Sequence, residues 1–308
     1  MLNIFKIGHY TDLQNGTGCT VIIPPAENVS AAVAMGASPG SREYALMQPD
    51  KKIQSISALL LTGGSAYGLA AATGVVDALE AQGIGYKTGF GIVPIVPAAV
   101  IFDLNIGNGK IRPGHREGEA AVKAACYNNI ENGNVGAGTG ALVGKWAGMD
   151  SAMKGGLGIG QVEHGVLKTS AVAVVNAVGD IINKNGEILS GAVKDGQFLA
   201  SSDPKKRWGA PAVGLAENTM LIAVLTNARI NKQNAAYLAQ RGHLGITRRT
   251  DPSHTSFDGD TAFVISSNEV EAPLDTISAV VIEAVENAII DAVVSADPLF
   301  NFPSVKSI

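Results

Sequence analysis

The chain has 308 residues, of which 46% are hydrophobic and 16% are charged, and its net charge is −4. The hydrophobic content excludes a disordered chain. The charged content is low against about 25% in an average domain, which indicates a large core or extensive subunit contacts. Because a negative net charge disfavours contact with nucleic acid or an anionic membrane, neither is expected as a partner.

The cysteines and the apolar segments indicate the compartment. Cys19 and Cys126 lie far apart and outside any CxxC motif, so a disulfide scaffold is excluded and a reducing compartment is expected. The first residues lack the basic head and apolar stretch of a signal peptide. The longest apolar run, residues 91–102, is shorter than the ~20 residues of a membrane helix. We therefore expect a cytoplasmic protein that does not enter a membrane.

Strand-like and helix-like segments alternate along the chain. Apolar runs bounded by turn residues predict strands at residues 20–23, 57–61, 170–177 and 220–226. Apolar residues at helical spacing predict helices at residues 66–82, 117–125 and 274–296. This mixture predicts an α/β or α+β fold. No segment has the composition of a linker, so residues 1–308 are expected to form a single domain.

Residues 201–217 differ from their surroundings. They are polar and then rich in glycine and proline, and they directly precede the predicted strand at 220–226. Composition alone favours an ordinary surface loop.

Glycine-rich motifs give no support for a nucleotide cofactor. Residues 136–141 satisfy GxGxxG/A, but a polar turn precedes them where the dinucleotide motif needs a strand. Only three residues separate Gly140 from Gly144-Lys145, and Trp146 follows, so the phosphate-loop pattern also fails. None of the five histidines is spaced as a metal-binding pair, and no GxSxG motif is present. No cofactor and no metal are therefore expected.

The segment Asp258-Gly259-Asp260 admits two interpretations. Asp-Gly is a strong turn signal, so the segment could be a hairpin turn. Alternatively, two close carboxylates could orient a reacting group or handle protons, since their repulsion would separate their pKa values. Taken alone, the pattern favours the turn.

Seven motifs, in order from Gly8 to the last helix, resemble those of the DmpA-type aminopeptidases. This family comprises L-aminopeptidase/D-esterases, β-peptidyl aminopeptidases and nylon-oligomer hydrolases. The motifs lie at residues 61–69, 94–104, 136–140 with 144–145, 154–158, 174–180, 218–219 and 257–261. Any one of them is weak evidence, but seven in the same order are strong.

The resemblance implies an N-terminal-nucleophile hydrolase with a four-layer αββα sandwich fold of the DmpA and ornithine acetyltransferase type. Such a precursor cuts its own chain before a serine or threonine, and the matching bond here is Asn218–Thr219. The expected products are an α fragment, 1–218, and a β fragment, 219–308. The resemblance also implies a homotetramer that acts on small peptides, amides or esters.

A threonine at a new N-terminus carries its own base. A hydroxyl is a poor nucleophile until its proton is removed. An α-amine has a reference pKa of about 7.7–8.0, so it is partly neutral near working pH and can accept that proton. This accounts for the absence of a Ser-His-Asp pattern.

Further site residues follow from the resemblance, one at a time. Asn176 matches the asparagine that binds the oxyanion, and Lys145 matches a lysine near the nucleophile in the nylon-hydrolase branch. Asp258 and Asp260 match the pair that orients the nucleophile after cleavage. The β-aminopeptidases have serine and glutamate there, so this sequence agrees with the nylon-hydrolase branch instead. Tyr67 is a candidate substrate-binding residue, although it could simply pack at a helix start.

Two other functions stay open on the same fold. An acyltransferase of the ornithine acetyltransferase type would share the self-cleavage and the threonine nucleophile, and it would transfer an acyl group to an amine faster than to water. A non-enzymatic homologue would keep the fold and remain uncleaved.

Overall fold

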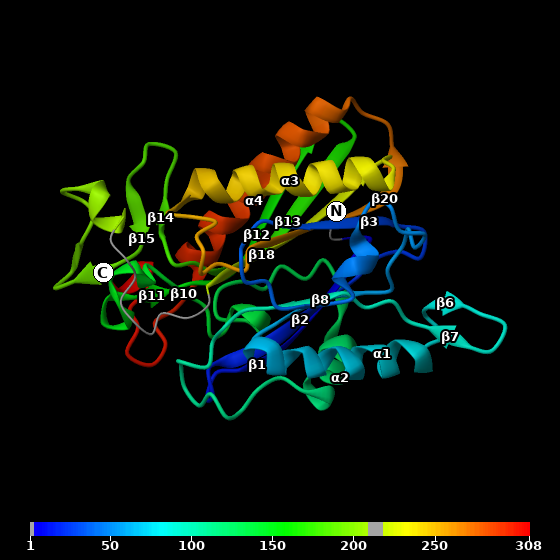
Figure 1. Ribbon diagram of the computed structural model, residues 1–308, viewed down its shortest axis with the longest axis horizontal. Helices are drawn as coiled ribbons and strands as arrows, with labels where there is room; N and C mark the ends of the chain where they lie inside the picture. Colours follow the sequence, from blue (N-terminus) through cyan, green and yellow to red (C-terminus); the bar gives the residue numbers. More distant parts are fainter. Residues whose placement is uncertain (1–2, 209–217) are drawn as a thin grey trace.

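The computed structural model describes residues 3–208 and 218–308, and its elements form four layers (Figure 1). Two β-sheets pack face to face, and two helices cover the outer face of each sheet. In order across the first sheet, the strands are β4 (Ser41–Arg42), β8 (Ala98–Val100), β5 (Leu59–Thr62), β2 (Thr17–Ile23), β1 (Lys6–Asp12) and β9 (Cys126–Tyr127). The second sheet has the order β12 (Gly156–His164), β13 (Leu167–Asn176), β18 (Thr219–Ala228), β20 (Thr261–Val270) and β3 (Val29–Ala34).

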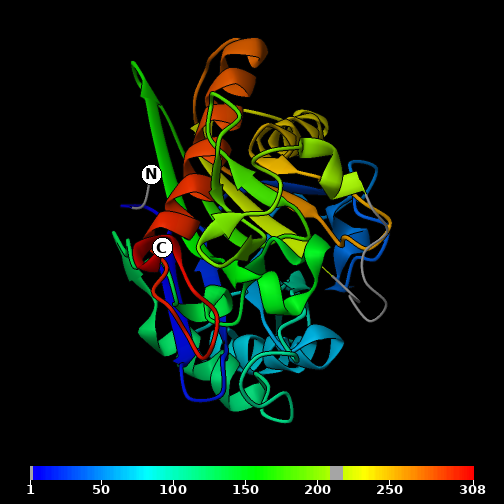
Figure 2. The ribbon, with the colours of Figure 1, turned by 90° about the vertical axis from the view of Figure 1, so that its left-hand side faces the viewer.

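The helical layers lie on opposite sides of the two sheets. α1 (Ala71–Ala81) and α2 (His115–Ala124) cover the first sheet, whereas α3 (Lys232–Arg249) and α4 (Leu274–Ser295) cover the second (Figures 1 and 2). The smaller strands are β6 (Tyr86–Lys87) with β7 (Ile92–Val93), β10 (Leu142–Val143) with β11 (Met153–Lys154), β14 (Asp180–Ile182) with β15 (Ile188–Ser190) and β19 (Thr250–Asp251), and β16 (Val193–Lys194) with β17 (Gln197–Phe198). The predicted four-layer αββα sandwich is therefore confirmed.

The central strand β18 is buried along its whole length. It pairs with β13 in the antiparallel sense and with β20 in the parallel sense. Leu221, Ala223 and Leu225 face the core between the two sheets, and the alternate residues face α3 and α4. A strand buried on both faces needs apolar residues at every position, which explains the uninterrupted MLIAVL run.

Alternate glycines of β12 allow α4 to approach the second sheet closely. A Cβ atom on Gly156, Gly158 or Gly160 would come within 2.6, 2.1 and 2.0 Å, respectively, of carbonyl oxygens of α4. Part of the glycine excess therefore serves this helix–sheet contact, which any side chain would separate.

The other predicted elements are found, with shifted ends. All four predicted strands are present as β2, β5, β13 and β18. The predicted helix at 66–82 begins as the 3-10 helix Ser65–Ala70 and continues as α1. Among residues 3–208 and 218–308, no helix is long and apolar enough to cross a membrane. Most of the predicted loop at 201–217, residues 209–217, lies outside the described residues.

Candidate active site

Thr219 and Asn176 meet at one end of the second sheet. Thr219 is the first residue of β18, and it lies directly opposite Asn176, the last residue of β13. Both are buried, with exposed fractions of 5% and 1%. On the other side of Thr219, Asn218 forms a parallel bridge with Asp258, just before β20. The bond between Asn218 and Thr219 thus lies in extended backbone between two neighbouring segments.

The Asn218 carbonyl oxygen accepts two hydrogen bonds. The Gly259 backbone N–H donates to it at 2.7 Å, and the Thr219 hydroxyl donates at 2.6 Å. The Asn218 N–H donates to the Phe257 carbonyl at 3.0 Å and fixes the other side of the peptide. Donors placed on a carbonyl oxygen stabilise the negative charge that develops when a nucleophile attacks its carbon.

Gly259 leaves room for the threonine hydroxyl. A Cβ atom at Gly259 would lie 2.7 Å from Thr219 Oγ1 and 2.7 Å from the Ser38 carbonyl oxygen. Only glycine therefore lets the backbone N–H approach Asn218 while the hydroxyl keeps its place.

Lys145 is bound to the asparagine opposite Thr219. Its Nζ donates to Asn176 Oδ1 at 2.9 Å and to the Asn176 carbonyl oxygen at 3.1 Å. The Asn176 side-chain amide donates to the Phe102 carbonyl at 3.2 Å, and Asn176 Oδ1 also accepts from the Leu142 N–H. Because an amide nitrogen carries two hydrogens, one of these can still face a ligand.

The pKa of Lys145 is lowered to about 7. Burial is the main cause and the charge of Lys154 adds to it, while the charges of Asp258 and Asp260 act in the opposite direction. An ordinary lysine is charged near neutral pH. Lys145 is instead divided between its charged and neutral forms, so it can accept or release a proton at working pH.

The two aspartates are buried and hold different groups. Asp260 Oδ1 accepts from the Met220 backbone N–H at 2.7 Å, so this carboxylate fixes the residue next to Thr219. Asp258 Oδ2 accepts from the Thr255 N–H at 2.6 Å. Burial and the charge of Asp260 raise the pKa of Asp258 to about 6, against the opposing effects of Thr255 and Lys145.

The hairpin-turn interpretation of Asp258-Gly259-Asp260 is wrong. The Asp258 N–H bonds back to the Thr255 carbonyl at 3.1 Å, so the turn precedes the aspartates. Asp258 already bridges to Asn218, and β20 begins at Thr261. The segment is thus the approach to a central strand, where both carboxylates are buried.

His254 belongs to this cluster, although its sequence context gave no prediction for it. Its Nδ1 lies 2.8 Å from Asp260 Oδ2. The signal was available in the sequence, since His254 is six residues before Asp260 in the same polar segment. The spacing of the histidines predicts no metal pair, and it carries no signal for a contact with a carboxylate. Among residues 3–208 and 218–308, no group of three or more acidic, histidine or cysteine side chains could hold a metal ion.

Tyr67 is exposed, unlike the residues of the buried cluster. It lies in the 3-10 helix Ser65–Ala70 with 62% of its surface exposed, and the Arg112 guanidinium stacks on its ring at 3.9 Å. Because Arg112 packs on the ring, the alternative that Tyr67 packs at the helix start stays open. Its role as a substrate-binding residue stays a prediction.

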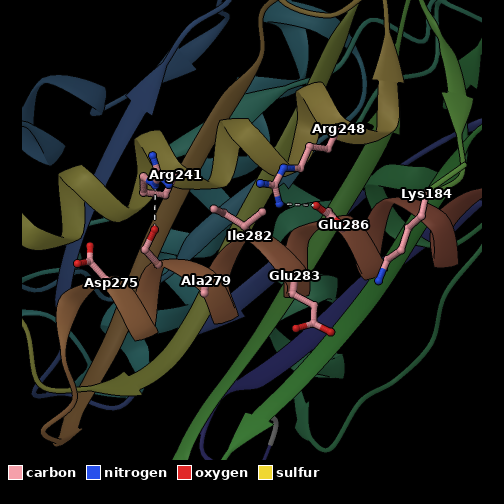
Figure 3. Close-up of a pocket in the computed structure, with 9 residues that line it drawn as sticks. Lys184, Arg241, Arg248, Asp275, Ala279, Ile282, Glu283 and Glu286 are labelled. Carbon is pink, nitrogen blue, oxygen red and sulfur yellow. Dashed lines mark hydrogen bonds and ion pairs between the residues drawn. The ribbon is translucent and has the colours of Figure 1, made fainter. Parts of the chain in front are cut away.

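A surface cavity of about 600 Å³ lies between α3 and α4, away from this cluster (Figure 3). Charged side chains line it, and several already pair with one another. Arg248 bonds to Glu286 at 3.1 Å, and Arg241 donates to Ser278 at 2.8 Å. None of the buried residues around Thr219 contributes to its lining.

Comparison with known proteins identifies relatives across nearly the whole chain. The model of peptidase family S58 matches residues 4–304. An uncharacterized aminopeptidase of Mycobacterium tuberculosis is 31% identical over 98% of this chain and 94% of its own length. A 6-aminohexanoate-oligomer endohydrolase of Paenarthrobacter ureafaciens is 32% identical over 86% of this chain and 73% of its own length.

Solved structures share the fold at low sequence identity. The L-aminopeptidase D-Ala-esterase/amidase of Ochrobactrum anthropi, described as a variant of the Ntn hydrolase fold, has a TM-score of 0.70 with 18% identity and covers 95% of this chain and 84% of that one. A β-aminopeptidase of Burkholderia sp. has a TM-score of 0.68 with 19% identity and the same coverage.

Proposed function

The chain belongs to peptidase family S58 and is a hydrolase with the Ntn hydrolase fold, and on this premise we propose that it cuts its own Asn218–Thr219 bond and then hydrolyses small amides with Thr219. The observation that carries the proposal is the Asn218 carbonyl, which accepts hydrogen bonds from both the Gly259 N–H and the Thr219 hydroxyl.

In the proposed self-cleavage, Thr219 Oγ bonds to the Asn218 carbonyl carbon and the peptide C–N bond breaks. The hydroxyl proton passes to the Thr219 nitrogen, which becomes a free α-amine. Water then hydrolyses the ester and leaves a carboxylate on Asn218 and the restored hydroxyl on Thr219. The Gly259 N–H stabilises the oxyanion of this step, since it already contacts the carbonyl oxygen.

Lys145 is the proposed proton carrier in the precursor. No α-amine exists there before cleavage, so another base is needed. The pKa of about 7 leaves part of Lys145 neutral, and its Nζ binds Asn176, the residue that pairs with Thr219. These two facts support its role as the first acceptor of the hydroxyl proton.

In the mature enzyme, the α-amine of Thr219 takes over as the base. The free N–H of the Asn176 amide would bind the oxyanion of the substrate, and Asp260 would hold the Met220 N–H so that the new N-terminus stays in place. Asp258 and Lys145 set the charge around the amine. Self-acylation and substrate hydrolysis thus use the same nucleophile.

The proposed substrates are small peptides or amides with a free amino end. The names of the relatives include aminopeptidases and an endohydrolase of 6-aminohexanoate oligomers, and both groups cleave amide bonds. The low charged content of the chain supports burial of surface between copies, and we also propose the homotetramer that the resemblance implies. We propose the cytoplasm as its compartment, because its two cysteines fit a reducing environment.

Intact-mass measurement of the purified protein tests this proposal. We expect fragments 1–218 and 219–308, whose masses sum to that of the chain plus one water. Thr219→Ala should stay full length and inactive, while Thr219→Ser, which keeps a hydroxyl, should still be cut. A parent chain that remains whole after long incubation would support the non-enzymatic alternative. Normal cleavage of Thr219→Ala at the same bond would show that Thr219 is not the nucleophile.

A further inference from the structure

The two oxygens of the Asp260 carboxylate hold two different parts of the molecule. Oδ1 accepts from the Met220 N–H at 2.7 Å, and Oδ2 lies 2.8 Å from His254 Nδ1. Met220 directly follows the proposed nucleophile, so a single buried carboxylate connects the strand of Thr219 to a histidine ring. No part of the proposed reaction uses this ring.

The His254 ring is held between Asp260 and a second histidine. His254 has a left-handed backbone with φ of 52°, an uncommon conformation for residues other than glycine. Its ring packs edge-on against His243 of α3, with the ring centres 4.8 Å apart. Only 17% of the His254 side chain is exposed.

His243 is itself fixed to the sheet. Its Nε2 lies 2.9 Å from the Val33 carbonyl oxygen of β3, so Nε2 must carry the hydrogen. Burial lowers the pKa of His243 to about 4, and this ring is therefore neutral near pH 7. A neutral ring with a hydrogen on Nε2 has an unprotonated Nδ1, and no partner for that atom exists in the described part of the chain.

The acidic neighbours favour the charged form of His254. Burial alone would lower its pKa, but the hydrogen bond and charge of Asp260, together with the charge of Asp258, raise it overall. His243, whose ring also packs against His254, is neutral. The acidic neighbours thus favour a His254 ring that donates from Nδ1 to Asp260.

We propose that His254 is a positioning residue for Thr219, acting through Asp260: its Nδ1–H fixes the carboxylate so that the other oxygen holds the Met220 N–H and the start of β18 in place. The inference rests on the proposed function, because it assumes that Thr219 is the nucleophile. Reactions of this kind are sensitive to position, and a displacement of about 1 Å can cost about 10²-fold in rate.

The first test compares His254→Ala with His254→Asn. Asparagine can place an N–H close to the position of Nδ1, whereas alanine removes the donor. For His254→Ala we expect kcat of the mature enzyme to fall by about 10- to 100-fold with KM changed by less than about twofold. His254→Asn should recover kcat to within about fivefold of the parent. The half-time of self-cleavage, followed by intact mass, should lengthen more in His254→Ala than in His254→Asn.

His9 provides the matched control. It is also a half-buried histidine whose ring makes one hydrogen bond, to Thr20 Oγ1, and the Nε2 atoms of both His9 and His254 have no partner in the described residues. It lies on β1 in the other sheet. His9→Ala should lower the midpoint of thermal unfolding by a similar amount to His254→Ala, while kcat stays near that of the parent.

Parental kcat in His254→Ala, or equal losses in the alanine and asparagine variants, would overturn the inference. If His254→Ala does not fold, His254→Gln replaces it, since glutamine moves the donor toward the Nε2 position. An active asparagine variant with a weak glutamine variant supports the inference, and the reverse order overturns it. Failure of the proposed function is distinct, because the parent chain would then neither cleave itself nor depend on Thr219.

Discussion

Two regions of the molecule bury a lysine in nearly the same way, but the lysine of one region binds Asn176, the residue that pairs with Thr219. Lys145 and Lys154 are 2% and 0% exposed, and burial lowers the pKa of each to about 7. Within the described part of the chain, the Nζ of Lys154 donates to two backbone carbonyls, those of Thr139 at 2.8 Å and Ala141 at 2.7 Å. The pKa alone therefore does not tell the two lysines apart.

The partners distinguish them. Asp103, the acid that faces Lys154, is held by the Thr17 hydroxyl and the Gly64 N–H, each at 2.7 Å. That region connects the end of β11 and the start of β2 to neighbouring loops. Lys145 instead binds a side chain, that of Asn176, and faces the two aspartates before β20. A perturbed pKa is thus a sign of function only where the group contacts others that can react.

The largest expected effect comes from exchanging each lysine for methionine. Lys145→Met should slow self-cleavage by about 10²- to 10⁴-fold, because a general base normally contributes that much. Lys154→Met should instead lower stability, because it leaves the buried Thr139 carbonyl without its donor at a cost of about 1–3 kcal/mol, whereas the Ala141 carbonyl keeps the Gly155 N–H. Intact-mass time courses measure the rate of self-cleavage, and urea unfolding measures the stability. Similar losses of rate in both variants would remove the distinction between the regions.

The next effect concerns the asparagine that binds Lys145. Asn176→Ala should lower kcat of cleaved enzyme by about 10²- to 10³-fold, as expected for loss of one oxyanion donor. Asn227→Ala is a matched control, since Asn227 is buried near the other end of β18. In the described residues its side chain bonds the Lys168 N–H and the Val166 carbonyl, which are backbone groups at the adjoining end of β13 and the turn before it. A parental kcat in Asn176→Ala would exclude this residue from the reaction.

The central strands and α4 could be predicted because their signals are local, whereas the four-layer arrangement came from the resemblance. The apolar runs of the central strands and the periodicity of α4 are visible in the sequence. α3 was missed because Gly242 and Gly245 weaken a helix by about 1 kcal/mol each relative to alanine. The helix is stabilised by packing against β3, β20 and α4, and such contacts are not visible in a helix read by itself.

The site was predictable only where a motif carried it. Thr219, Asn176, Lys145 and the two aspartates came from the resemblance, and the structure brings them to one end of the second sheet, although their roles stay predictions. Asp-Gly read alone favoured a turn, because local propensity ignores the bridge to Asn218. The contacts of His254 depend on the tertiary fold in the same way.

A smaller effect is expected from Asp258→Asn. A carboxylate near an ammonium group raises its pKa, so loss of Asp258 should lower the pKa of the Thr219 α-amine and shift the acidic limb of the rate profile to lower pH. Weaker positioning should reduce kcat by about 10- to 100-fold. A pH–rate profile of cleaved protein measures both. An unchanged profile and rate would mean that Asp258 has only a structural role.

The same substitution changes how stability depends on pH. The folded-state pKa of Asp258 is raised, to about 6, so the native chain binds this proton more tightly than the unfolded chain does. Its contribution to stability is therefore present at low pH and is lost as pH rises toward and through 6. In Asp258→Asn that decline should be reduced when the free energy of unfolding is measured between pH 4 and 7.

The smallest expected effect tests whether the Lys154 region has any functional surface. The Gly64 N–H that holds Asp103 directly precedes the 3-10 helix carrying Tyr67, and Arg112 covers the Tyr67 ring. An exposed cation–π contact is worth about 0.5–1 kcal/mol, or roughly two- to fivefold in an equilibrium constant. If Tyr67 contacts substrate, Tyr67→Ala should raise KM by about this factor at unchanged kcat, and Tyr67→Phe, which keeps the ring, should not. An unchanged KM in Tyr67→Ala would confine substrate contacts to the Lys145 region. Loss of kcat in Tyr67→Ala, with the thermal midpoint preserved, would instead join the two regions into one site.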